Sequence, residues 1–252
     1  MPGFVSHTVM AHDVYNMINK DNVNLDYMVT YSLGGDLCKY AKCRYDSHHK
    51  DMDKFIYMMA DYIKDNNLVN DKEVMGVLYG HICHYVMDSI IHPLVRMVDK
   101  TCIKNKNNHT LIEEYYDSYL VKERCKIDKK EYLKKRVLKA KVNRKISKML
   151  NYVYMEVYNT DKVSVFYKFN LLLYRLLSNI YIIFSKKNIE KIIGLNRFID
   201  NNKDVDLFNN DNKISYKDYL RYECSYSLMY LYEESMDIAC EYISNVNKYL
   251  DI

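Results

Sequence analysis

The chain has 252 residues, of which 49% are hydrophobic and 28% are charged, and its net charge is +4. These values exclude a disordered tail and a protein built from membrane-spanning segments, and the length is enough to bury a sizeable core. Only 6 Gly and 2 Pro are present. That is too few for an all-β chain with many tight turns or for a Gly-rich nucleotide-binding fold, so helices are favoured.

Apolar periodicity and the spacing of helix-breaking residues predict an all-α protein. The expected helices cover about residues 12–30, 52–65, 72–92, 109–122, 128–157, 162–185 and 215–249. No internal repeat and no Pro-, Gly- or Ser-rich linker divides them. We therefore predict a single multi-helix domain over residues 1–252.

Two of these helices carry further expectations. Pro93 is expected to end the third helix, because proline removes a backbone donor and restricts the residue before it. The most apolar stretch, residues 169–184, is interrupted by Arg175 and Asn179 and is too short and too polar to span a bilayer. We expect a buried core helix there, and no transmembrane segment in the chain.

The cysteines and the N-terminal residues indicate where such a chain would reside. The 7 Cys are widely spread without a CxxC pair, which indicates neither a disulfide framework nor a thiolate zinc finger. The N-terminal segment lacks the basic region and apolar run of a secretory signal. The expected location is the cytoplasm, or outside the cell if a leader has been removed.

Histidines are concentrated in the first part of the chain, where all 8 lie at or before position 109. In the helix expected over residues 72–92, four metal-capable side chains fall within about 80° of one another around the axis. They are His81, His84, Asp88 and His92. The rest of this helix is apolar, so a buried Asp among His must be paired or metal-bound. The alternative is a hydrogen-bonded His/Asp ladder without metal.

A second group follows on the next expected helix, where His109, Glu113 and Asp117 are spaced one turn apart. Alone this spacing is weak evidence, because His/Glu pairs at i, i+4 are frequent on helix surfaces. Beside the first group it is stronger, since several His and carboxylates on two helices suit a zinc site with a position open for water.

Residues 121–149 are strongly basic, with 13 Lys/Arg against 3 Asp/Glu. Such a segment could lie on anionic lipid or on a nucleic-acid backbone. The alternative, which we favour, is a solvated helix face with its apolar residues packed inward. Those residues are Leu133, Val137, Leu138, Val142 and Ile146.

The stretch GHICHYVMDSIIHP at residues 80–93 resembles the GxxxHYxxDxxxHP signature of the zinc-dependent phospholipase C family. That family includes bacterial phosphatidylcholine-hydrolysing enzymes and the catalytic domain of clostridial alpha toxin, and its fold is shared by single-strand-specific zinc nucleases. The resemblance implies an all-α domain of this type. Four further segments are similar in the same order, namely residues 5–15, 31–40, 47–55 and 223–243.

Carried over residue by residue, the resemblance implies two to three clustered zinc ions. Asp36, His48, His84 and Asp88 correspond to the ligands of the first ion. His92, His109 and Glu113 correspond to those of the second. His7 corresponds to a ligand of a third ion, to which Asp88 would form the bridge. His49 is the alternative to His48. His81 stands where the family usually carries an apolar or aromatic residue, and we expect it to support the ligands or simply to be buried. Asp117, one turn beyond Glu113, is expected to support a ligating histidine.

The activity that the resemblance implies is hydrolysis of a phospholipid head-group phosphodiester by a metal-activated water, with Asp36 as ligand and base. Residues 121–149 would then contact the membrane surface peripherally. The alternatives are a nuclease or nucleotidase on the same scaffold, and a metal-binding helical protein without activity. Three features depart from the family: Gly35 replaces a proline, the chain has no Trp, and no N-terminal amino group is expected at the position relative to His7 from which secreted members hold the third zinc. The C-terminal β-sandwich of alpha toxin is not expected either.

Overall fold

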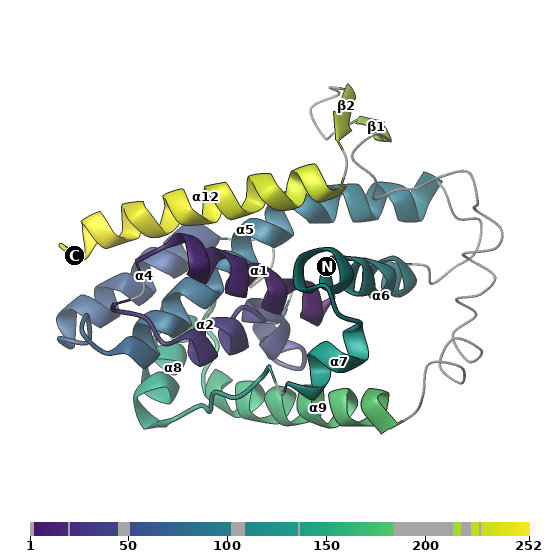
Figure 1. Cartoon of the computed structure of the whole chain (residues 1–252). Coiled ribbons are helices and arrows are strands. Elements are labelled where there is room, and N and C mark those ends of the chain that lie inside the picture. Colours follow the sequence, from purple (N-terminus) through teal and green to yellow (C-terminus); the bar gives the residue numbers. More distant parts are fainter. Residues whose placement is uncertain are drawn as a thin grey trace.

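The computed structural model describes residues 3–19, 21–44, 51–101, 109–135, 137–183, 214–217, 223–226 and 228–252. These residues are almost entirely helical, which confirms the predicted all-α class (Figure 1). The larger helices are α1 (Phe4–Met17), α2 (Leu25–Tyr31), α4 (Met52–Asp65), α5 (Lys72–Thr101), α6 (His109–Leu120), α7 (Lys129–Lys134), α8 (Arg144–Tyr158), α9 (Val163–Ile183) and α12 (Leu228–Tyr249). Short helical turns are η1 (Gly34–Cys38), η2 (Lys42–Arg44) and η3 (Val121–Cys125).

Helix α5 forms the centre of the core and packs against α1, α2, α4 and α12. Two glycines let α2 approach it closely, because a Cβ at Gly80 would lie 2.6 Å from the Met28 carbonyl oxygen and one at Gly76 would lie 2.7 Å from that of Asn24. Within the described residues, Lys72–Val95 is long and apolar enough to cross a membrane, but most of it is buried inside the protein. It is therefore the core helix of this fold.

Several predicted helix boundaries are wrong, each for a local reason. The helix expected over 12–30 is two helices, and α2 starts where the Asn24 side chain accepts a hydrogen bond from the Tyr27 backbone N–H. Pro93 lies inside α5 instead of ending it. The helix expected over 128–157 is interrupted between α7 and α8, where Asn143 caps the start of α8.

The C-terminal part also departs from the single helix expected over 215–249. Two short strands, β1 (Ile214–Lys217) and β2 (Glu223–Tyr226), pair antiparallel with Ile214 opposite Tyr226. Helix α12 follows and lies along α5, on the side of the molecule opposite α9 (Figure 1). Its buried residues include Tyr232, whose hydroxyl donates to Asp13 of α1 over 2.8 Å. This contact joins the end of the chain to its beginning.

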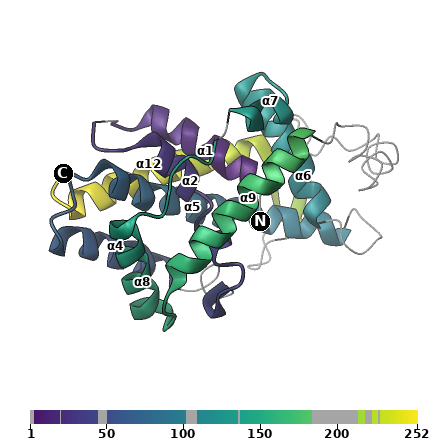
Figure 2. The same ribbon diagram turned by 90° about the horizontal axis from the view of Figure 1, so that it is seen from below.

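The expectation that residues 169–184 form a buried core helix is wrong. One face of α9 is buried through residues such as Val163, Tyr167 and Leu171. The opposite face exposes large apolar side chains, among them Phe169 at 54% and Leu172 at 65%. Figure 2, seen from below, shows α9 lying across the outside of the helical assembly. The helix is therefore a surface helix with an apolar outer face.

Candidate metal centre

Three segments distant in sequence bring His7, Asp36 and His84 together. His7 comes from α1, Asp36 from η1 and His84 from α5. One ligand atom of each lies within 4.8 Å of the others, and all three side chains are buried. Among the residues that the structure describes, this is the group whose donor types and spacing could hold a metal ion.

Asp88 completes the cluster one turn beyond His84. Its Oδ1 lies 3.3 Å from His7 Nε2, and its Oδ2 lies 3.6 Å from His84 Nε2. Burial alone would raise the pKa of the Asp88 carboxyl, but the neighbouring His84 and His7 rings hold that pKa well below its usual range. The carboxylate is therefore ionised and positioned between two imidazoles whose ring centres are 4.5 Å apart.

The His84 ring is oriented by Ser32, which lies just before η1 and four residues before Asp36. Its Nδ1 lies 3.1 Å from the Ser32 carbonyl oxygen, so Nδ1 carries the hydrogen and donates it there. The Nε2 atom is then the basic nitrogen and faces Asp88. A ligating histidine is commonly fixed through its other ring nitrogen in this way.

Gly34 is required where η1 passes the His84 ring. Its φ is +40°, and a Cβ built there would lie 2.3 Å from His84 Cδ2. We expect Gly34→Ala to destabilise the protein by about 2–4 kcal/mol, combining backbone strain with the displacement of a buried ring. Urea unfolding measures the loss, and zinc content measured in parallel should fall because His84 moves. Unchanged stability and zinc content would contradict this role of Gly34.

The polar atoms of the cluster fit a metal ion. Within the described part of the chain, both ring nitrogens of His7 and Oδ1 of Asp88 are buried without a hydrogen-bond partner of good geometry. Leaving such groups unsatisfied costs about 1–3 kcal/mol each. A cation bound between the imidazoles and carboxylates would satisfy them, because His nitrogens and carboxylate oxygens are the donors that zinc takes.

The structure does not place all the predicted ligands. His48 and His49 lie outside the described residues. His109 begins α6, but its side chain is also outside the described part. His92 on α5 and Glu113 on α6 are both half-buried, and α5 and α6 pack against each other. The assignment of His92, His109 and Glu113 to a second ion therefore stays a prediction.

His81 shares the stripe of His84 and Asp88 on α5 but faces a different environment. Its Nδ1 lies 2.8 Å from the Val77 carbonyl oxygen and its Nε2 lies 2.8 Å from the Tyr167 hydroxyl. Nδ1 therefore donates to Val77, and Nε2 accepts from Tyr167 of α9. His81 supports the packing of α5 on α9, and its ring nitrogens are occupied by these two protein partners.

Stability should depend on pH through His81. Burial lowers its pKa from 6.5 to about 4, so its contribution is complete above pH 6.5 and is lost as the pH falls towards 4. Between pH 7 and 4.5 the loss should be about 2 kcal/mol. Urea unfolding at pH 7 and at pH 4.5, with metal removed from the protein by a chelator, measures this loss. His81→Gln should reduce the pH dependence by that amount, and an unchanged dependence would contradict the assignment.

Asp117 positions the residue next to His7. Its Oδ1 accepts hydrogen bonds from the backbone N–H of Ser6 at 2.8 Å and from the Ser6 hydroxyl at 2.5 Å. Its Oδ2 accepts from the buried Lys129 ammonium at 3.2 Å, and Lys129 also lies 2.7 Å from Glu114. The pattern of the sequence did not single out Ser6 or Lys129 as supporting residues. The Ser-His pair near the N-terminus was the available signal for Ser6, whereas nothing in the basic segment distinguishes Lys129.

The fold and the cluster define a protein of the all-α class with a buried His/Asp site able to hold a metal ion. Residues 6–156, more than half of the chain, match the family model described as zinc dependent phospholipase C. The chain therefore belongs to the zinc-dependent phospholipase C family, and the resemblance noted in the sequence is confirmed. The matched range contains His7, Asp36, His84 and Asp88. No curated protein and no solved structure gives a significant match.

Proposed function

We propose that the protein is a zinc-dependent phosphodiesterase that hydrolyses a phospholipid to diacylglycerol and a phosphorylated head group. The observation that carries this proposal is the buried cluster of His7, Asp36, His84 and Asp88 in a chain of the zinc-dependent phospholipase C family. Such a donor set has the composition of hydrolytic zinc sites, which keep a coordination position for water.

The zinc ligands of this proposal are assigned by the family resemblance, with support from the geometry of four of them. Asp36, His48, His84 and Asp88 would hold one ion. His92, His109 and Glu113 would hold a second ion. His7 would hold a third with Asp88 as the bridge, and the 3.3 Å between His7 Nε2 and Asp88 Oδ1 supports that pairing. The proposed content is two to three ions per chain.

Zinc bound in this cluster would act as a Lewis acid on the phosphodiester and lower the pKa of a coordinated water. The chain contributes the rest of the site. His84 is held by Ser32 with Nε2 as its basic nitrogen, and Asp88 is kept ionised between two imidazoles. Asp36, only 5% exposed, is the proposed base that takes a proton from the attacking water. Because Asp36 is buried, few molecules of bulk water can reach its carboxylate and take the place of the attacking water.

Substrate assays distinguish this proposal from a nuclease on the same scaffold. The protein is purified without chelator, its zinc is measured by mass spectrometry, and it is given short-chain phosphatidylcholine below its micellar concentration. Release of phosphorylcholine by the zinc-loaded protein supports the proposal. Hydrolysis of single-stranded DNA or RNA instead would identify a nuclease. Bound zinc without any hydrolysis would identify a metal-binding helical protein.

Histidine variants on one helix provide a matched comparison. His7→Gln removes a member of the cluster, whereas His12→Gln changes an exposed histidine on the same helix. Both remove one imidazole from α1. Loss of zinc or activity in the first variant alone would assign the effect to the site.

A further inference from the structure

The outer face of α9 carries a continuous apolar stripe. Val165, Phe169, Leu172, Leu176 and Ile180 are 40–65% exposed, and their spacing of three or four residues places them along one line of the helix. Tyr40, which is 55% exposed, extends the stripe through a ring contact with Phe169, with 6.0 Å between ring centres. Contiguous exposed apolar surface of this kind marks an interaction site more often than single exposed residues do.

The surroundings of the stripe are basic. Helix α9 contains Lys168 and Arg175 and no acidic residue. Residues 132–155 contain eight Lys/Arg and no Asp/Glu. The segment between α7 and α8 lies against α9, because Arg175 donates hydrogen bonds to the carbonyl oxygens of Leu138 at 2.8 Å and Ala140 at 2.5 Å. The apolar stripe is thus bordered by positive charge on that side.

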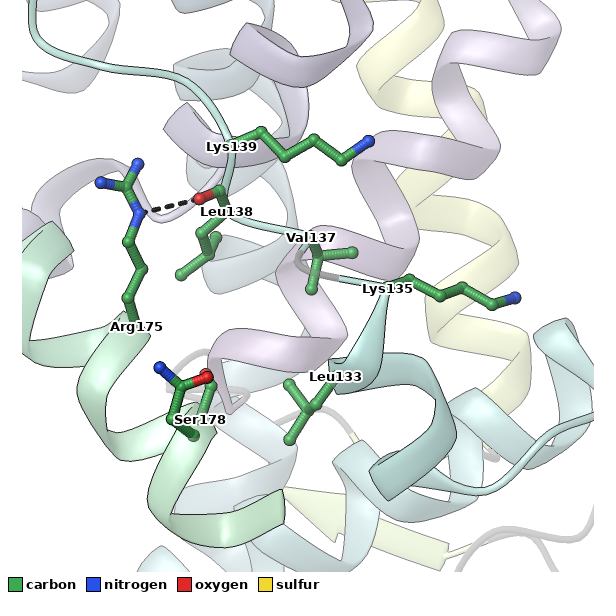
Figure 3. Close-up of a pocket in the computed structure, with 8 residues that line it drawn as sticks. Leu133, Lys135, Val137, Leu138, Lys139, Arg175 and Ser178 are labelled. Atoms are coloured by element: carbon green, nitrogen blue, oxygen red, sulfur yellow. Dashed lines mark hydrogen bonds between the residues drawn. The ribbon is translucent and has the colours of Figure 1, made fainter. Parts of the chain in front are cut away.

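A cavity of about 550 Å³ lies between α9 and this basic segment (Figure 3). Arg175 and Ser178 line it from α9, and Leu133 and Leu138 line it from the other side. The side chains of Lys135 and Lys139 extend from the same segment on the side away from Arg175, and the Lys139 ammonium lies 3.2 Å from Oδ1 of Asp26. The border of the apolar stripe is therefore hollowed, with Arg175 and Lys135 among the lining residues and room for a phosphate-bearing head group.

The inner face of α9 adjoins the candidate metal centre. Asn170 donates a hydrogen bond to the Leu37 carbonyl oxygen over 2.9 Å, immediately after Asp36. Tyr174 packs on Phe4 with 5.4 Å between ring centres, three residues before His7. The apolar stripe and the walls of the site thus lie on opposite faces of one helix, and a helix with its side chains is about 10 Å thick.

We propose that the outer face of α9, with the basic segment 132–148 beside it, is the surface by which the protein docks on an anionic phospholipid membrane. The choice of partner rests on the proposed function, because the substrate would be part of that membrane. The charge of the surface supports an anionic membrane as the partner. Two copies of this face would bring like charges together, whereas anionic lipid head groups would attract the lysines while the apolar stripe inserts into the membrane. The family model ends at residue 156, before α9 begins.

Co-sedimentation with vesicles of phosphatidylcholine mixed with phosphatidylserine tests this surface. The double variant L172E/L176E should lower the partition coefficient roughly tenfold or more, because two inserted leucines become charged. The control M155E/I238E adds the same two charges at exposed apolar positions of α8 and α12 and should bind as the unchanged protein does. Binding should also weaken with salt and on removing phosphatidylserine.

Hydrolysis of monomeric short-chain phosphatidylcholine separates this inference from the proposed function. L172E/L176E should retain that activity while losing vesicle binding. If the protein without substitutions binds vesicles through α9 but hydrolyses no phosphatidylcholine, the proposed function is wrong and the proposed docking surface is supported. The proposed docking surface is wrong if L172E/L176E binds vesicles as well as the unchanged protein does. It is also wrong if the unchanged protein does not bind vesicles. A dimer in sedimentation equilibrium that L172E/L176E dissociates would assign the face to a second copy of the chain.

Discussion

Replacing Asp88 by Asn should remove at least one zinc ion per chain and lower hydrolysis by a factor of about a thousand or more, equivalent to about 4 kcal/mol. The substitution keeps the shape of the side chain and removes the negative charge that lies 3.3 Å from His7 and 3.6 Å from His84. A cation between these groups would lose its proposed bridging ligand. Zinc content by mass spectrometry and phosphorylcholine release from a monomeric substrate measure the two effects.

Asp237→Asn is the matched control, since Asp237 is an exposed carboxylate on α12 and its loss should change neither quantity. Thermal unfolding with and without chelator gives an independent readout. Chelation should lower the melting temperature of the unchanged protein but hardly alter that of Asp88→Asn, because ligand stabilisation depends on binding to the folded state. If Asp88→Asn holds as much zinc as the unchanged protein, Asp88 is not a zinc ligand.

The juxtaposition of His84 and Asp88 could be predicted because it depends only on helical geometry. Residues four apart lie on the same face of any helix, and the apolar residues around them indicated that this face would be buried. His7 and Asp36 are different. Their approach to His84 depends on how α1 and η1 pack against α5, which no local spacing encodes, so only the family resemblance placed them in one site.

The environment of His81 could not be read from the helical wheel. It falls within the same stripe as His84, yet its Nε2 accepts a hydrogen bond from Tyr167, 86 residues away. The wheel gives the direction in which a side chain points but not which neighbour packs there. The same limit applies to Asp117, whose partners are Ser6 and Lys129.

The errors in the fold have a common physical origin in tertiary packing. Pro93 was expected to end a helix, but α5 continues through it while packed against α12 and α6, and such contacts can offset the lost hydrogen bond. Apolar residues surround most of α9, so its composition could not show which face the core would cover. The packing of α9 against η1, α7 and α8 identifies its outer face.

Replacing Lys129 by Met should destabilise the protein by about 3–5 kcal/mol, because it leaves two carboxylates without their buried cation. Lys129 is 5% exposed and lies 2.7 Å from Glu114 and 3.2 Å from Asp117. Burial lowers its pKa, but the two carboxylates outweigh burial and raise that pKa above its usual value. The ammonium is therefore charged in the folded protein, and urea unfolding at neutral pH measures its contribution.

Lys130→Met changes the adjacent, half-buried lysine and should cost less than about 1 kcal/mol. The triple variant K129M/E114Q/D117N removes the charges together and should be less destabilised than the sum of its single changes, since no uncompensated charge stays buried. The ion pair between Lys129 and Asp117 is also connected to the candidate metal centre, because Asp117 accepts hydrogen bonds from Ser6 and Ser6 precedes His7. Lys129→Met should accordingly weaken zinc retention against a chelator, whereas unchanged stability and retention would show that α1 is held without this network.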